Sequence, residues 1–140
     1  MDLASIIKRL SEQSAELRFV GGSADIPSQS APAKRPSAFV YPLIEQPAAN
    51  TLVSGVDQRV QVRFAVLLCV TDARPGIHQG RTLTELEAVR ESVRIALLNW
   101  QPPNASDICE FAGGQLQAMG DGLLWWQDDY QTAEHWRKTD

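Results

Sequence analysis

Cysteine and long apolar runs are scarce in this sequence, and each scarcity excludes a class of protein. Cys69 and Cys109 are the only cysteines, and their spacing assembles neither a four-ligand zinc site nor a disulfide framework. The apolar stretch at residues 65–70 is far shorter than the roughly 20 residues that cross a bilayer. The first residues, which include Lys8 and Arg9, contain no apolar run of signal-peptide length. We therefore expect a protein made in the cytoplasm that does not interact with a membrane.

Catalytic motifs are also missing. His78 and His135 are the only histidines, and they lack the i,i+4 spacing of a helical metal site. Asp128 and Asp129 are neighbours on an expected strand, so their carboxylates point to opposite faces and cannot share a substrate. Cys69 lies in an apolar strand, which is typical of a buried thiol. No glycine-rich phosphate loop or nucleophile elbow is present. We predict a protein that is not an enzyme, without catalytic, metal-binding or cofactor-binding residues.

Positive charge is the third shortage. Thirteen Lys and Arg residues face 17 Asp and Glu residues, which gives a net charge of -4. This sign disfavours a protein that grips nucleic acid through its phosphates. In contrast, 44% of the residues are hydrophobic, which is an ordinary globular composition rather than a disordered one. A chain of 140 residues is close to the commonest domain size, so we expect one domain spanning residues 1–140.

Two amphipathic segments predict helices. Apolar residues in the first 17 positions recur at helical steps, which indicates a helix from Asp2 to about Ala15. Thr84 and Glu87 form a capping box, so a second helix is expected to start there. It is expected to end near Trp100, because two prolines follow at 102–103. The apolar stripe of this helix consists of Leu86, Val89, Val93, Ala96, Leu97 and Trp100.

Alternating segments predict a sheet. Residues 56–70 alternate apolar and polar positions and then become apolar on both faces, so both sides of the second half are expected to be covered. Residues 37–45 form another strand in which Pro42 indicates an edge or a bulge. Residues 108–118 and 123–136 predict a C-terminal hairpin. Phe19 and Val20 favour a short strand that Gly21-Gly22 ends. The expected class is α+β, with a mostly antiparallel sheet of about four strands on which an N-terminal and a central helix pack.

Three segments lack periodic apolar residues. Residues 24–36 are rich in proline and are expected to form an exposed loop. Residues 72–81 are expected to form a second exposed loop, and residues 137–140 a disordered tail. We interpret the two loops as contact elements that are dispensable for folding.

The tryptophan pair Trp125-Trp126 is the most unusual feature of the last strand. Adjacent strand residues face opposite sides, so one core does not easily bury both rings. One hypothesis is that one of the rings contacts a neighbouring subunit. The alternative is that Trp125 lies under a helix and Trp126 fills the remaining gap.

Four sequence units, in this order and spacing, resemble the tail terminator proteins of long-tailed bacteriophages. They are PSAFV at Pro36 to Val40, VRFAV at Val62 to Val66, the helix end from Arg90 to Pro102, and the unit WQDDYQT at Trp126 to Thr132. The resemblance covers nearly the whole chain. The spacing of the helix end and of the last unit carries it most strongly.

The resemblance implies a virion structural protein of a phage or prophage. Such proteins are small α+β domains that assemble as a ring, usually hexameric, on the head-proximal end of the tail tube. The ring ends tube polymerisation and provides the surface for head-tail joining. The implied partners are further copies of the chain, the tail tube protein and a head-completion or neck protein, while DNA passes through the lumen without specific binding. Candidate subunit or tail contacts are Trp125, Trp126, Tyr130, Trp136, Lys34, Arg35, Arg74, His78 and Arg81.

Two other functions remain open at this stage. The chain is compatible with another phage neck or tail assembly protein, because such proteins share related folds. It is also compatible with a small cytosolic enzyme or ligand-binding domain whose pocket has no recognisable motif. The size of the protein in solution separates a ring-forming protein from these alternatives.

Overall fold

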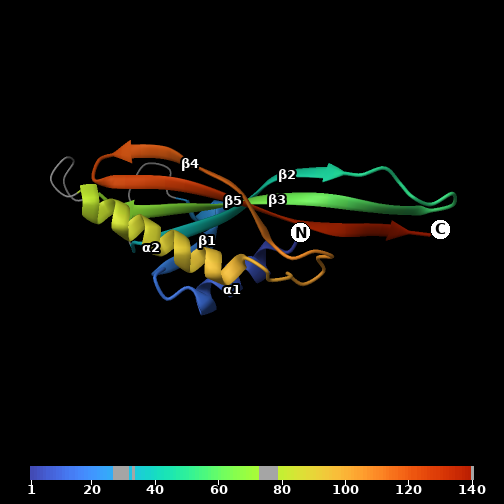
Figure 1. The fold of residues 1–140 in the computed structure, drawn as a ribbon, viewed down its shortest axis with the longest axis horizontal. Helices are drawn as coiled ribbons and strands as arrows, with labels where there is room; N and C mark the ends of the chain where they lie inside the picture. Colours follow the sequence, from blue (N-terminus) through green and yellow to red (C-terminus); the bar gives the residue numbers. More distant parts are fainter. Residues whose placement is uncertain (27–31, 33, 73–78, 140) are drawn as a thin grey trace.

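The computed structural model shows two helices packed on one five-stranded sheet (Figure 1). It describes residues 1–26, 32, 34–72 and 79–139, with the backbone alone for 79–81. The strand order is β1-β2-β3-β5-β4; β1 runs parallel to β2, and all other neighbours are antiparallel. The expected α+β class is confirmed, with one strand more than expected. The elements are α1 (Leu3–Gln13), β1 (Phe19–Gly22), the short 3-10 helix η1 (Ser23–Asp25), β2 (Ser37–Pro47), β3 (Val56–Thr71), α2 (Gln79–Leu97), β4 (Glu110–Gly120) and β5 (Leu123–Lys138).

The short strand expected at Phe19 and Val20 is confirmed as β1, which continues through Gly22. Gly21 and Gly22 were expected to end a strand, but they pair with Phe39 and Val40 of β2. Glycine at position 21 avoids a steric clash, because a Cβ there would lie 2.6 Å from the Asp25 carboxylate. The entropic cost of ordering two glycines is offset by their parallel pairing with β2. This pairing joins distant segments, so the local sequence does not predict it.

The helices follow the expected periodicity, but α2 begins earlier than expected. In α1, the N-cap Asp2 accepts a hydrogen bond from the Ser5 backbone amide at 3.3 Å. The α2 helix begins at Gln79, five residues before the predicted capping residue Thr84. The first turn of α2 is anchored to the residue after β3, because the Thr82 hydroxyl donates to the Asp72 carboxylate at 3.1 Å and both residues are buried. A local capping pattern cannot exclude such a tertiary extension, and the exposed loop predicted from residue 72 is wrong at Asp72.

The main core lies between the helices and one face of the sheet. Both predicted helix stripes are confirmed: Ile6 and Leu10 of α1 meet the α2 stripe over the even-numbered residues of β3. Every even position of β3 from Val60 to Val70 is at most 2% exposed. The prediction that the second half of β3 is covered on both sides is also confirmed, because Ala65 and Cys69 on the opposite face are fully buried.

On the opposite face of the sheet, a small group of aromatic side chains packs together. Phe39 lies between Phe19 and Trp125, with ring centroids 5.8 and 6.1 Å away. Pro32 is buried, and its carbonyl oxygen accepts a hydrogen bond from the guanidinium of Arg35. The expectation that residues 24–36 form an exposed loop is therefore wrong at Pro32, while Ala24 and Asp25 are exposed and residues 27–31 and 33 lie outside the described residues.

The C-terminal hairpin is confirmed. β4 and β5 are joined at Asp121 and Gly122, whose φ angles of 53° and 76° fit a left-handed two-residue turn. The predicted irregularity at Pro42 is also confirmed, because the β2–β3 register shifts between Pro42 and Ile44. The disordered tail predicted from residue 137 is wrong at positions 137 and 138, which continue β5 opposite β3.

Candidate assembly interface

Carboxylates and thiols are the candidate reactive groups among the described residues. No group of three or more His, Cys, Asp or Glu residues within them is arranged to hold a metal ion. Asp128 and Asp129 occupy opposite faces of β5, as expected from the strand period. Burial raises the pKa of the Cys69 thiol to about 11 and that of the Cys109 thiol to about 12. Both thiols are therefore protonated at neutral pH, which is the opposite of an activated nucleophile.

Trp126 is part of an internal charge cluster under α2. Its ring lies 4.7 Å from the Arg90 guanidinium, and its indole N–H donates to the Asp128 carboxylate at 2.8 Å. Arg90 donates to both oxygens of Asp128, from Nε at 2.9 Å and from Nη2 at 3.0 Å. The Asp128 side chain is fully buried. Gly114 lies against this cluster, where a Cβ would approach the Asp128 carboxylate to 2.5 Å.

This cluster corrects two sequence-based expectations. Arg90 lies outside the predicted apolar stripe of its helix, yet its guanidinium neutralises a buried carboxylate. Burial lowers the pKa of the Arg90 guanidinium, yet the hydrogen bonds that Arg90 donates to Asp128 and Glu87 outweigh this effect and raise its pKa above the ordinary value. Trp126 was the first choice for a subunit contact, but it is half-buried on the face that α2 covers.

Trp125 and Tyr130 also differ from the expectation. Trp125 lies on the face away from the helices, next to Phe39, so the alternative that placed it under a helix is wrong. Tyr130 is fully buried between Phe64, which stacks on it at 5.9 Å, and Phe111, which meets it edge-on at 5.7 Å. A fully buried ring in the centre of the core is not a contact surface of the folded chain.

The other candidate contact residues are spread over the molecule. Trp136 is 47% exposed near the end of β5. Lys34 is exposed, whereas Arg35 is half-buried and donates a hydrogen bond to the Thr71 hydroxyl at 2.9 Å. Arg74 and His78 lie outside the described residues, as does the side chain of Arg81. The structure therefore does not bring Trp136, Lys34 and Arg35, the described members of this set, into one surface.

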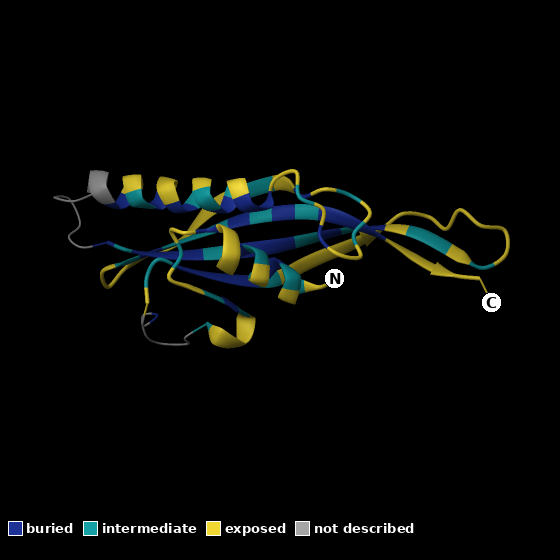
Figure 2. Cartoon of the chain, turned by 90° about the horizontal axis from the view of Figure 1, so that it is seen from below, coloured by how far each residue is buried: buried dark blue, intermediate teal, exposed yellow. Residues whose placement is uncertain are grey.

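The feature that sequence reasoning missed is a projecting arm, formed by residues 43–59 and 135–139. It consists of the end of β2, the start of β3 and the end of β5, and it extends beyond the part of the sheet that the helices cover (Figure 1). None of its residues is buried, as the exposed and intermediate colours in Figure 2 show. Isolated strands without a packed apolar face are marginally stable in water. The arm therefore has the properties of an element that packs against another molecule.

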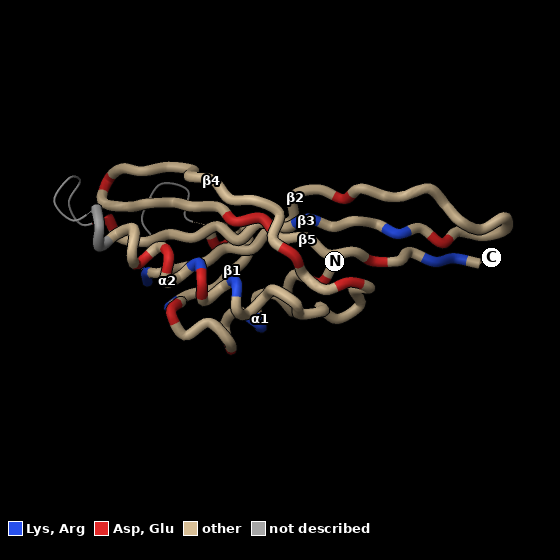
Figure 3. Tube along the Cα trace, viewed as in Figure 1, with Lys and Arg blue, Asp and Glu red and all other residues tan. Residues whose placement is uncertain are grey.

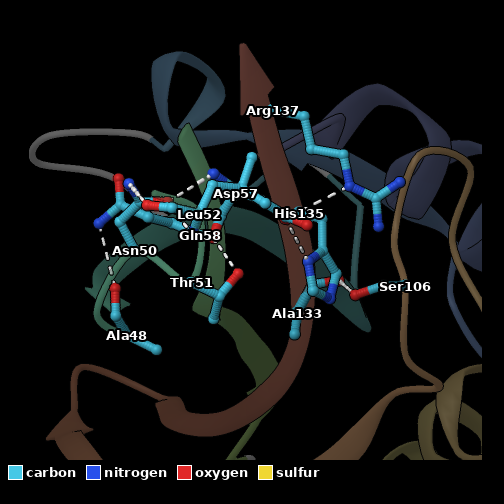
Figure 4. Close-up of polar contacts among 10 residues, drawn as sticks. All are labelled: Ala48, Asn50, Thr51, Leu52, Asp57, Gln58, Ser106, Ala133, His135 and Arg137. Carbon is cyan, nitrogen blue, oxygen red and sulfur yellow. Dashed lines mark hydrogen bonds and ion pairs between the residues drawn. The ribbon is translucent and has the colours of Figure 1, made fainter. Parts of the chain in front are cut away.

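The loop at the end of the arm, residues 48–55, is held in one conformation by Asn50 (Figure 4). The Asn50 side-chain oxygen accepts from the backbone amides of Leu52 at 3.2 Å and Asp57 at 2.8 Å. Its amide group donates to the carbonyls of Leu52 and Gly55, at 3.3 and 2.9 Å. Gly55 has φ 88° and its Cβ position lies 2.8 Å from the Lys138 carbonyl oxygen, so the end of β5 packs against the loop.

Behind the loop, a polar cluster ties β3 to β5. The Asp57 carboxylate contacts His135 Nδ1 at 3.1 Å and accepts from Arg137 Nε at 3.3 Å (Figure 4). The hydrogen bond from His135, followed by that from Arg137, lowers the pKa of Asp57. The cross-strand pairs and Asn50 together replace the missing apolar core of the arm.

The ordered loop presents two apolar side chains to solvent. Val53 is fully exposed and Leu52 is 40% exposed. A preformed loop loses little conformational entropy on binding, so such residues are well suited to an interface. The available sequence signal was Asn50 and Gly55 flanking an apolar pair between two strands, which marks a turn with an exposed tip.

Comparison with known proteins gives the family. The model of the phage tail terminator protein family matches residues 1–140. A chain from the solved virion of a native gene transfer agent particle has a similar fold, with a TM-score of 0.60 and 11% identity, over 95% of this chain and 93% of that chain. No curated protein sequence matches. Among the described residues, no helix is long and apolar enough to cross a membrane. The chain belongs to the phage tail terminator protein family and is a structural protein of the phage tail.

Proposed function

We propose that the protein forms a ring on the head-proximal end of the tail tube, where it ends tube polymerisation and provides the surface for head-tail joining. The observation that carries this proposal is the arm, whose preformed apolar tip lies beyond the body of its own chain. A ring requires two different complementary surfaces on each subunit, because each copy contacts its neighbours head to tail. A projecting arm supplies one such surface.

The remaining features support a structural role. The described residues contain no candidate metal cluster, and both thiols are buried and protonated. The proposed partners are further copies of the chain, the tail tube protein and a head-completion or neck protein. The net charge of -4 suits a lumen through which DNA moves without being held, because like charges repel phosphates from the wall.

Deletion of the gene tests this function. In a phage lacking the protein, tails are expected to reach abnormal, unregulated lengths and heads to remain unjoined, as seen by electron microscopy. Supplying the wild-type chain from a plasmid is expected to restore normal lengths and joined particles. Tails of normal length in the deletion strain contradict the terminator role, and normal tails with unjoined heads assign the protein to a later step of neck assembly.

A further inference from the structure

The outer face of α2 carries an exposed ridge that its own chain leaves uncovered. The ridge consists of Ala88, Glu91 and Ile95 of α2 and of Leu98, the residue directly after the helix, whose backbone amide still donates to Arg94. Steps of three and four place these residues along one side of the helix. Ile95 is 72% exposed and Leu98 is 38% exposed. An apolar pair of this kind on a solvent-facing helix marks an interaction site more often than chance exposure of a single residue does.

We propose that the tip of the arm of one copy docks on the α2 ridge of a second copy, so that each subunit of the ring gives one arm and receives one. This inference rests on the proposed ring, because it names the two surfaces through which the ring would close. Leu52 and Val53 would pack against Ile95 and Leu98, removing the most exposed apolar groups of both surfaces from water.

The charges of the two surfaces are complementary. Lys138 pairs with Val56, the first residue of β3, so it lies about 3 Å behind the loop that carries Val53, while the adjacent Arg137 contacts Asp57 of its own chain. Both basic residues are exposed, and the end of β5 appears as a basic segment at the end of the arm (Figure 3). On α2, the exposed carboxylate of Glu91 lies one helical turn, about 6 Å, from Ile95. The apolar tip with a basic residue behind it thus fits an apolar ridge that carries an acidic residue.

Edge-to-edge strand pairing is a weaker route to the same ring. The open edge of β2 in the arm contains Pro47, which has no amide to donate, and follows the irregularity at Pro42. The open end of β5 carries charged side chains, including Arg137 and Lys138. Prolines and charges are the devices by which natural sheets block their edges. The arm is therefore built to dock through its tip rather than to extend a neighbouring sheet.

The test uses single substitutions at exposed positions that leave the core intact. Val53→Asp removes the tip, Ile95→Asp removes the ridge, and Leu83→Asp is the control, because Leu83 is 53% exposed on the same helix outside the ridge. Light scattering of the purified full-length chains is expected to show rings for the wild type and the control, and monomers for the two interface variants. Equal thermal midpoints by circular dichroism would show that all chains are folded.

Mixing the two interface variants gives a sharper result. The intact arm of Ile95→Asp still fits the intact ridge of Val53→Asp, so an equimolar mixture is expected to stop at a dimer. A charge-reversal experiment tests the same contact. Glu91→Lys and Lys138→Glu are each expected to weaken assembly, and their combination in one chain is expected to restore it.

Phage complementation separates this inference from the proposed function. Val53→Asp and Ile95→Asp are expected to fail to restore tail length, while Leu83→Asp restores it. If the wild type rescues the deletion and both interface variants rescue it equally well, the docking is overturned and the terminator role stands. If the deletion strain makes normal tails, the terminator role itself fails. Complementation decides the matter even if the purified wild type is monomeric until it meets the tube.

Discussion

Replacing Arg90 by alanine tests whether the cluster under α2 stabilises the fold. The substitution leaves the Asp128 carboxylate fully buried, with the Trp126 indole N–H as a remaining hydrogen-bond donor. Removing one partner of a buried ion pair typically costs about 3–5 kcal/mol. The Arg90 side chain is 16% exposed and the indole donor remains, so we expect the lower end, about 3 kcal/mol.

Urea denaturation followed by circular dichroism measures this change. For a domain of this size, about 3 kcal/mol corresponds to a fall of about 6–12 °C in the thermal midpoint. Arg94→Ala is the matched control, because Arg94 lies one turn away, is 31% exposed and only approaches Glu87 at 4.0 Å. We expect the control to change the free energy of unfolding by less than about 0.5 kcal/mol.

A double-mutant cycle with Asp128→Ala isolates the pair itself. Once the carboxylate is absent, removing Arg90 no longer leaves a buried charge, so the double variant is expected to be much less destabilised than the sum of the single variants. A cost below about 0.5 kcal/mol for Arg90→Ala alone would refute the assignment of a buried, dependent carboxylate.

Two further predictions concern the core. Val93 is fully buried among apolar neighbours, so Val93→Asp is expected to unfold the domain, since an unpaired buried carboxylate costs several kcal/mol. A soluble variant with a native circular dichroism spectrum contradicts this. In the folded protein, Cys69 and Cys109 are expected to resist a thiol-labelling reagent at pH 8, because both thiols are buried and their pKa values are raised above the ordinary 9.0. Both are expected to react after unfolding in urea. Since the folded pKa of Cys69 is about 11, the unfolded chain ionises first, and stability should fall as pH rises from about 9 towards 11; rapid labelling of the folded chain at pH 8 would count against this burial.

The sequence by itself determined the elements whose signal is local. The alternation along β3 and the helical stripe through Val89 and Val93 predicted which residues are buried, because strand and helix periods fix the side on which each residue lies. The two strand segments at residues 108–118 and 123–136 predicted the hairpin that closes at Asp121 and Gly122. The four units from Pro36 to Thr132 pointed to the family that the comparison confirms.

The tertiary structure alone decided which side of the sheet the helices cover. The strand period places Trp125 and Trp126 on opposite faces of the sheet, but it does not show which face the helices cover. The packing of α2 placed Trp126 under Arg90 and left Trp125 on the other face. Arg90 and Asp128 are 38 residues apart in sequence, so no local pattern showed that this arginine neutralises a buried carboxylate. The parallel pairing of β1 with β2 was hidden for the same reason.

The arm was also decided by tertiary structure. A pattern along one strand shows which residues alternate, but not where the helices stop covering the sheet. β3 continues through both regions without a break, and only the arrangement of α1 and α2 leaves its first four residues outside the buried part of the sheet. The sequence thus determined the strands and their faces, because these depend on neighbours along the chain. The projecting tip and its surroundings depend on contacts between distant segments, which only the folded chain brings together.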